Sequence, residues 1–555
     1  MSLRTGGQIL VDQLKVHGTS HVFCVPGESY LAVLDALHDA DIKTIVCRQE
    51  GGAAYMAEAA GKITGQPGIV MVTRGPGATN ASCGIHVAAQ DSTPLIMFVG
   101  QVARDMKERE AFQEIDYKAV FGSIAKWVVE IDRAERIPEI VSRAFHVATQ
   151  GRPGPVVIAL PEDMLTDTVN VPDALPYAPV VMKPGAADME ALQRRLLAAE
   201  RPIILAGGSG WSEQGVKDLQ HFAEAFELPV AVSFRRQMLF PADHPNFAGD
   251  LGIGPNPKLL ERVKNADLVL LVGGRLSEMP SQSYTLFDIP GDGAKLVHVH
   301  PGAEELNKVY RAGLGILATP HAFAAAAAEL PKPNAVKWAG AAKAAHADYL
   351  AWSDTSKIRT AGDLQMAEVM AHLKQVMPAD TVYCNGAGNY ATWVHRFWPF
   401  RAFASQLAPT SGTMGYGVPA AVAAKALQPG REVMAFAGDG CFMMNGQEFA
   451  TMLQYGLPVI VVVVDNGMYG TIRMHQEREY PGRISATALR NPDFAALARA
   501  YGGHGETVRT TAEFGPALAR ARASGHPAII HCLINPEAIT PARSLTDIRN
   551  AALKK

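Results

Sequence analysis

Two polar clusters in the last third of the chain follow apolar runs and contain the residue types of a binding site. Gly438-Asp439-Gly440 comes after one run, and Asp465-Asn466-Gly467 comes after another. Neither run alternates between apolar and polar residues, which is typical of strands buried in a parallel sheet. Because ligands bind outside the carboxyl ends of such strands, we expect Asp439 and Asn466 to lie at one site.

The chemistry of these clusters is that of oxygen ligands. Asp439 and Asn466 are 466 − 439 = 27 residues apart, which leaves room for one crossover helix. A carboxylate, an amide oxygen and a backbone carbonyl suit Mg²⁺ or Ca²⁺, whose other ligands come from phosphate and water. Gly438 and Gly440 allow the backbone to approach an anion. A GDG sequence alone is more often a simple turn, but the spacing to Asn466 makes the pattern specific.

Short apolar runs separated by helix-like stretches recur along the whole chain of 555 residues. They predict an α/β fold of three doubly wound parallel-sheet domains. Proline-rich or polar linkers are expected at 171–185 and 331–338. The predicted domains are residues 1–175, 186–340 and 360–555.

The first and third blocks resemble each other. Residues 52–77 parallel residues 414–440, and residues 151–163 parallel residues 525–537. An internal duplication predicts two similar domains, and a chance likeness between βα units is the alternative.

The bulk composition excludes several classes of protein. A net charge of -3 gives no reason to expect nucleic acid or an acidic membrane as partner. No apolar run approaches the roughly 18 residues that cross a bilayer, and the N-terminus reads as an amphipathic helix rather than a signal peptide. Six cysteines without a CxxC pair indicate reduced thiols. We therefore expect a soluble, cytoplasmic protein.

The segment from Gly438 to Asn466 resembles the diphosphate-binding motif of the thiamine diphosphate enzymes. The resemblance implies that Asp439, Asn466 and the main-chain carbonyl of Met468 hold Mg²⁺ against the cofactor's diphosphate. Asp465 departs from the family, which has an asparagine there. The loop 386–393 is similar to a second diphosphate-contacting loop, although an ordinary strand-to-helix turn is its alternative. The cofactor-binding residues implied by the whole likeness also include Gly388, Asn389, Tyr390, Gly438, Gly440 and Tyr469.

Glu50 is the candidate acid. It ends the strand-like stretch 44–50 and opens a helix of small residues. A buried, unpaired glutamate is costly and tends to mark function, but an acid stabilised by the helix dipole fits the same position. Its R-x-E-x-x-A setting matches the catalytic-glutamate segment of acetolactate synthase-like enzymes, where the glutamate activates the cofactor's aminopyrimidine. The stretch 410–421 is similar to that family's segment with the methionine beneath the bent cofactor, here Met414.

The likeness to the acetolactate synthase branch covers nearly the whole chain. It implies that Gly27, Phe112, Gln113 and Lys126 form the wall of the substrate channel, with Gly27 also in the cofactor site. Each of them could instead be structural, and a solvated surface role suits Lys126 at least as well. His86 has no counterpart to carry over, so a helical histidine with satisfied contacts is favoured over a proton carrier. In this family the glutamate and the metal come from different chains, which implies a homodimer or homotetramer with active sites between chains.

Two departures from the family affect the predicted substrate and cofactors. His475 stands where branched-chain members have a tryptophan that selects the larger acceptor, so a polar acceptor is an alternative. His300 and Gly302 replace acidic residues of flavin-binding relatives, and the sequence leaves FAD binding open.

The resemblance implies a thiamine diphosphate- and Mg²⁺-dependent carbon–carbon lyase or ligase. A 2-oxo acid such as pyruvate would be decarboxylated and then joined to a second carbonyl compound, with Glu50, Gln113 and His475 as the catalytic residues. The alternatives on this scaffold are a 2-oxo acid decarboxylase, an FAD-linked oxidase and a diketone-cleaving enzyme. A dinucleotide oxidoreductase is disfavoured because no GxGxxG opens a helix after a strand. A catalytically silent relative would not need Glu50, Asp439 and Asn466 together.

Overall fold

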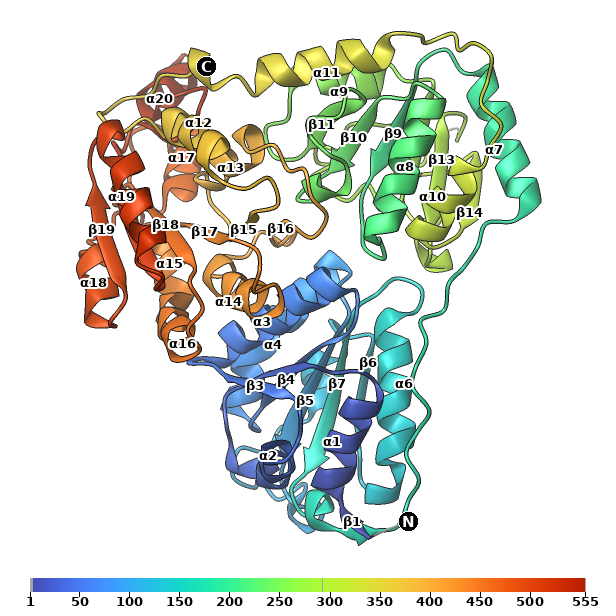
Figure 1. Cartoon of the computed structure of the whole chain (residues 1–555), viewed down its shortest axis with the longest axis vertical. Coiled ribbons are helices and arrows are strands. Elements are labelled where there is room, and N and C mark those ends of the chain that lie inside the picture. The colour runs from blue at the N-terminus through green and yellow to red at the C-terminus, as the bar shows by residue number, and fades with distance from the viewer. Residues whose placement is uncertain (1–2, 292, 555) are drawn as a thin grey trace. The chain divides into compact units, whose positions relative to one another are not determined.

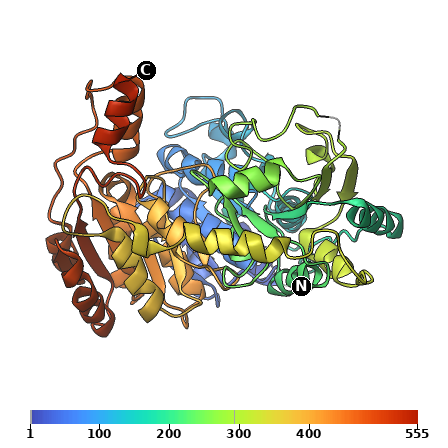
Figure 2. The same cartoon turned by 90° about the horizontal axis from the view of Figure 1, so that it is seen from above.

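The computed structural model describes residues 3–291 and 293–554. Within them lie three six-stranded parallel sheets, each flanked by helices (Figures 1 and 2). A two-stranded antiparallel ribbon joins β1 (Arg4–Thr5) to β8 (Thr168–Val169). The expected α/β class with three parallel-sheet domains is confirmed.

The first sheet has the strand order β3-β2-β4-β5-β7-β6. Helix α1 begins at a capping box, in which Thr5 and Gln8 satisfy each other's backbone amides. Strands β4, β5 and β7 are buried along their whole length, which explains why their sequences do not alternate. The elements are β2 (His21–Cys24), β3 (Lys43–Val46), β4 (Gly68–Val72), β5 (Leu95–Gln101), β6 (Trp127–Glu130) and β7 (Pro155–Pro161), with α1 (Gly6–Val16), α2 (Leu31–His38), α3 (Glu50–Thr64), α4 (Pro76–Asp91), α5 (Tyr117–Phe121) and α6 (Ile137–Thr149).

The central sheet has the order β11-β10-β9-β12-β13-β14. It follows residues 170–185, which contain no helix or strand, as the prolines there predict. The elements are β9 (Pro202–Ala206), β10 (Val230–Ser233), β11 (Phe247–Leu251), β12 (Leu268–Val272), β13 (Leu296–His300) and β14 (Leu314–Leu317), with α7 (Ala186–Ala198), α8 (Glu213–Ala225), α9 (Pro257–Lys264), α10 (Pro320–Ala328) and α11 (Ala341–Trp352).

The third sheet has the order β16-β15-β17-β18-β20-β19, which repeats the first sheet strand for strand, as a duplication predicts. Its strands are β15 (Val382–Asn385), β16 (Gln406–Leu407), β17 (Val433–Gly438), β18 (Ile460–Asp465), β19 (His504–Val508) and β20 (Ala528–Leu533). Its helices are α12 (Met366–Val376), α13 (Ala391–Phe397), α14 (Gly417–Leu427), α15 (Asp439–Asn445), α16 (Phe449–Gln454), α17 (Gly470–Glu479), α18 (Phe494–Ala500), α19 (Thr511–Ala523) and α20 (Leu545–Leu553).

The chain forms two compact units. The first contains residues up to 180 together with 418–428 and 445–457, and the second contains the rest of the chain from residue 181 onward. Helix α16 therefore belongs to the unit built on the first sheet, where the Tyr455 hydroxyl accepts from the Val46 amide at 2.7 Å. No helix among the described residues is both long and apolar enough to cross a membrane.

Candidate active site

A cavity of about 220 Å³ lies in the second unit, where β17 and β18 end. Since both strands are parallel and adjacent, the segments that follow them start from the same edge of the sheet. Every residue that the sequence predicts for cofactor or metal binding in the third block lines this cavity: Gly388, Asn389, Tyr390, Met414, Gly438, Asp439, Gly440, Asn466, Met468 and Tyr469. Their individual roles remain predictions.

Asp439 is the first residue of α15, directly after β17, and only 3% of it is exposed. Its Oδ2 accepts hydrogen bonds from the Met468 amide at 3.1 Å and from Asn491 Nδ2 at 2.7 Å. Burial raises the pKa of Asp439 to about 6, although the bond from Asn491 opposes the rise. A buried carboxylate of this kind is stabilised by a cation beside it.

Asn466 and Met468 shape the turn that faces Asp439. Asn466 Oδ1 accepts from the Met468 amide at 3.2 Å, and the next amide, that of Tyr469, donates to the Thr487 carbonyl at 2.9 Å. The turn thus brings a side-chain amide oxygen next to the Asp439 carboxylate. Together with the Met468 carbonyl, these are the ligand types that a hard divalent cation prefers.

The backbone of the cavity is closely approached by aromatic rings. A Cβ on Gly440 would lie 2.6 Å from Tyr469 Cε1, so only glycine fits there. Tyr390 is buried, and its hydroxyl accepts from the Gly386 amide at 3.0 Å and donates to Cys441 Sγ at 3.1 Å. The loop predicted to contact a diphosphate is therefore held in place by its own tyrosine.

Behind the cavity lies a polar network that the sequence interpretation missed. Asn491 Nδ2 donates to Asp439 Oδ2 and also, at 2.8 Å, to Asp465 Oδ1. His531 Nε2 lies 2.9 Å from Asp465 Oδ2. Burial alone would raise the pKa of Asp465, but the bonds from His531, the Gly467 amide and Asn491 hold it below its usual value. The only signal in the sequence was the departure at Asp465 itself.

Glu50 lies in the first unit, in the first turn of α3. Its Oε2 accepts from Asn80 Nδ2, on α4, at 3.0 Å, so the side chain is half-buried and partnered. Next to it, the fully buried Glu448 of η8 (Gly446–Glu448) accepts from the amides of Arg48 and Gln49, each at 3.0 Å. Burial raises the pKa of Glu448. Glu448 fixes the turn that leads into Glu50, and no local motif in the sequence pointed to it.

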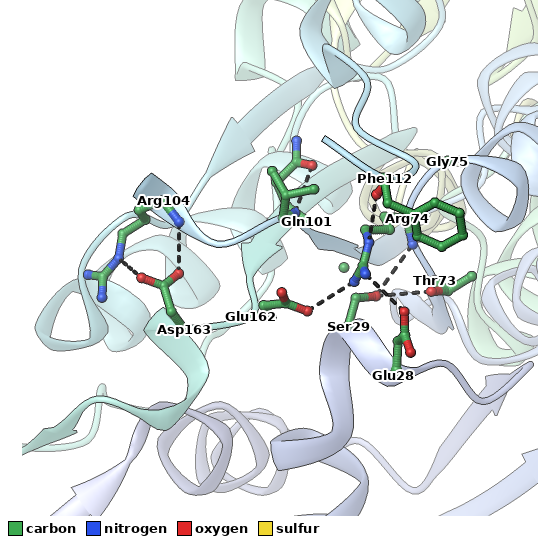
Figure 3. Close-up of polar contacts among 12 residues, drawn as sticks. Glu28, Ser29, Thr73, Arg74, Gly75, Gln101, Arg104, Phe112, Glu162 and Asp163 are labelled. Atoms are coloured by element: carbon green, nitrogen blue, oxygen red, sulfur yellow. Dashed lines mark hydrogen bonds and ion pairs between the residues drawn. The ribbon is translucent and has the colours of Figure 1, made fainter. Parts of the chain in front are cut away.

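Three more predicted residues of the first unit, Gly27, Phe112 and Gln113, lie in segments that contact residues 73–75. Figure 3 shows Phe112 beside Arg74. Gly27 packs against Thr73, where an added Cβ would lie 2.4 Å from the threonine Cβ. A Cβ on Gly75 would lie 2.8 Å from the Cβ of Gln113, whose φ is 65°. The Phe112 side chain is 72% exposed, and its carbonyl accepts from Arg74 Nε at 3.2 Å. The structure thus brings the segments that contain Gly27, Phe112 and Gln113 to residues 73–75, directly after β4.

Three candidates lie elsewhere. Lys126 Nζ donates to the carbonyls of Val147 and Gln150 at the end of α6, which is the structural role left open for it. His86 is exposed on α4. His475 lies on α17 but does not line the cavity; partial burial and the nearby Arg478 lower its pKa.

Comparisons with protein families match the three blocks separately. The N-terminal thiamine pyrophosphate (TPP)-binding domain of thiamine pyrophosphate enzymes matches residues 4–120, the central domain matches 189–327, and the C-terminal TPP-binding domain matches 386–532. The chain belongs to the thiamine pyrophosphate enzymes. It is 30% identical to the probable acetolactate synthase large subunit of Methanocaldococcus jannaschii, over 97% of this chain and 93% of that protein.

Other relatives place this thiamine pyrophosphate enzyme among the acetolactate synthase-like members. The Lactococcus lactis acetolactate synthase large subunit is 32% identical over 90% of this chain and 87% of its own length. The Escherichia coli isozyme 2 large subunit is 30% identical over 96% and 95%. The chain is thus a thiamine diphosphate-dependent enzyme of the transferase or lyase type, and the predicted family is confirmed.

The cavity of this thiamine pyrophosphate enzyme fits the diphosphate end of the cofactor. Asp439, Asn466 and the Met468 carbonyl supply oxygen ligands for a cation, and Gly440 leaves room for an anion beside them. The glycine turn at Gly208 in the central domain is closely packed. There an added Cβ on Gly208 would lie 1.7 Å from the Gly273 carbonyl oxygen, and Arg236 Nε donates to the Gly208 carbonyl at 2.8 Å. His300 is buried, accepts from the Gly302 amide, and its pKa falls to about 4 because of burial.

Proposed function

We propose that this enzyme is a Mg²⁺-dependent, acetolactate synthase-like carboligase. It would decarboxylate a 2-oxo acid such as pyruvate and join the remaining two-carbon unit to a second carbonyl compound. The observation that carries the proposal is the cavity at the ends of β17 and β18, which gathers the predicted cofactor and metal residues of the third block. The names of the similar large subunits support the substrate class.

The roles of the chain's own residues follow from their contacts. Bound thiamine diphosphate would supply the nucleophilic carbon that attacks the 2-oxo acid. Asp439, Asn466 and the Met468 carbonyl would hold Mg²⁺, and Met414, on the cavity wall, would support the bent cofactor. Asn80 fixes one oxygen of Glu50 and thereby orients the other to hold a proton for the aminopyrimidine. Gln113 and His475 would orient the acceptor.

The proposed enzyme is a cytoplasmic homodimer or homotetramer. Glu50 lies in one compact unit and the cavity in the other, and we propose that two copies of the chain complete each active site. The proposed domains are a pyrimidine-binding domain at 1–175, a central domain at 186–340 and a diphosphate-binding domain at 360–555.

Proton NMR of the purified enzyme with pyruvate, thiamine diphosphate and Mg²⁺ tests the proposal. We expect acetolactate from the wild type and a loss of about 10²–10⁴-fold in rate for Glu50→Gln, as for removal of an acid–base group. Glu50→Gln should still bind thiamine diphosphate, since the cavity in the second unit is unchanged. Acetaldehyde as the product would reassign the enzyme as a decarboxylase, and cleavage of a diketone but not of pyruvate would reassign its substrate.

No step of the proposed reaction is assigned to FAD, whose binding the sequence leaves open. Visible absorption of the purified protein tests this directly. A stoichiometric flavin, with acetate formed in place of acetolactate, would favour the oxidase alternative.

A further inference from the structure

Arg74 joins three segments that are far apart in the sequence. Its Nη2 lies 2.9 Å from Glu28 Oε1, its Nη1 lies 3.0 Å from Glu162 Oε2, and its Nε donates to the Phe112 carbonyl. Figure 3 shows the guanidinium at the centre of these partners. Only 8% of the side chain is exposed. Glu28 follows Gly27 in the chain, Phe112 is itself a candidate for the substrate wall, and Glu162 follows the end of β7.

Arginine suits this place for a geometric reason. Its planar fork offers donors in several fixed directions, whereas a lysine ammonium is a point charge that cannot reach three separated acceptors at once. The backbone beneath is fixed as well, because Ser29 Oγ lies 3.0 Å from Thr73 Oγ1 and also accepts from the Arg74 amide. The guanidinium therefore has a defined position from which to hold its partners.

The segment that Arg74 holds is the loop 107–116, between η2 (Arg104–Met106) and α5. Glu114 organises the loop internally by accepting from the amides of Glu108 and Ala111. Gln101 Nε2 secures its end through the Ile115 carbonyl. The bond from Arg74 to the Phe112 carbonyl ties the middle of the loop to the sheet, directly beside Gln113.

We infer that Arg74 is a positioning residue for the substrate wall formed by Phe112 and Gln113. The inference rests on the proposed function, in which these two residues face the substrate. Through Glu28, the same guanidinium also fixes the segment that begins at Gly27. One side chain therefore holds both this segment and the loop that contains Phe112 and Gln113. Arg74 has no proposed contact with substrate or cofactor; it acts by fixing the residues that do.

The matched control is Arg104, which lies in the same part of the first unit (Figure 3). Arg104 bonds to Asp163 at 2.7 Å and Asp167 at 2.8 Å, so it too is an arginine between two carboxylates. Within the described residues, no bond links its side chain to Phe112 or to Glu28. Arg74→Lys and Arg104→Lys therefore make the same chemical change, and only the first affects the loop anchor.

The experiment combines amide hydrogen exchange of peptides covering 107–116 with product analysis of the full-length enzyme supplied with pyruvate. We expect faster exchange in this loop for Arg74→Lys and more so for Arg74→Met, with Arg104→Lys like the wild type. The fraction of turnovers that ends in acetolactate rather than released acetaldehyde should fall roughly tenfold for Arg74→Lys, because about 1 Å of misplacement can cost up to a hundredfold.

Each outcome decides the inference. Unchanged exchange in Arg74→Lys would overturn it, and so would equal losses in both lysine variants, because general destabilisation would then explain them. Faster exchange with an unchanged product ratio would show that the loop does not position the acceptor. If the wild type does not use pyruvate, the proposed function fails, while the exchange data still decide whether Arg74 positions the loop.

Discussion

His531 Nε2 lies 2.9 Å from Asp465 Oδ2, and both side chains are buried behind the cavity. Asp465 stands where the family has an asparagine, so this chain carries an extra carboxylate beside its proposed metal site. His531 supplies the donor that this carboxylate needs, and Asn491 connects it to Asp439. The pair explains how the chain tolerates the departure.

Replacing His531 with alanine should therefore destabilise the protein and weaken metal binding. A buried acceptor that loses its partner costs about 1–3 kcal/mol, and the loss of a residue that orients a metal ligand typically costs 10–100-fold in affinity. Urea unfolding measures the first effect, and Mg²⁺ titration of thiamine diphosphate binding measures the second. The change Asp465→Asn in the His531→Ala background removes the unpaired carboxylate and should restore most of both. Failure of this rescue would show that His531 acts independently of Asp465.

Chelation of divalent ions should abolish activity, and recovery should need Mg²⁺ and thiamine diphosphate together. Asp439→Asn removes the charged ligand and should weaken Mg²⁺ affinity by more than about a hundredfold, beyond the 10–100-fold that the loss of an outer residue typically costs. Asp465→Asn is the matched control, because the same change is made to a neighbouring carboxylate that is not a proposed ligand. Calorimetric titration with Mg²⁺ in the presence of the cofactor separates the two. Equal affinities in both variants would contradict the proposed ligand set.

Glu448→Ala should lower both stability and turnover. The substitution leaves the amides of Arg48 and Gln49 without their buried acceptor, at about 1–3 kcal/mol for each unsatisfied group. It also frees the turn that leads into Glu50. Gln454→Ala is the control on the same segment, since Gln454 bonds only to the exposed side chain of Arg48 among the described contacts. Thermal unfolding and the rate with pyruvate should change for Glu448→Ala and stay near wild type for Gln454→Ala.

The sequence predicted the fold through local features that the structure keeps. Unalternating runs such as those around Val70 and Val462 became strands buried on both faces. The spacing between Asp439 and Asn466 predicted their meeting, because one crossover returns the chain to the adjacent strand. Local geometry of this kind fixes residues that lie at the end of a strand or in the turn that follows it.

The remaining contacts depend on tertiary packing and could not be predicted. Asn491 lies in a loop, and nothing in its local sequence indicates that its amide joins two strand-end carboxylates. Glu448 is 400 residues from the Arg48 amide that it accepts from. His475 does not line the cavity, and its role toward the acceptor stays a prediction.

The last helix gives a prediction for acid stability. Glu477, on α17, is buried and accepts bonds from Arg549 on α20, at 2.6 and 2.7 Å, and from Arg473. The bond from Arg549 is the main cause that lowers the pKa of Glu477 to about 2, and burial opposes it. A carboxylate whose pKa is lowered by folding stabilises the folded state at any pH above its pKa in the unfolded chain, about 4.3. This contribution is lost as the pH falls toward 2, the pKa in the folded state.

Glu477→Gln should therefore reduce the free energy of unfolding at pH 7 by roughly 3 kcal/mol, the scale set by a shift of this size. The difference from the wild type should shrink steadily between about pH 5 and pH 2, since protonation then removes the same charge from the wild type. Urea unfolding across this range measures it. Glu479→Gln, an exposed carboxylate on the same helix that pairs only with its neighbour Arg478 among the described contacts, is the control. A difference that stayed constant with pH would mean that Glu477 stabilises α20 by shape and hydrogen bonding rather than by its charge.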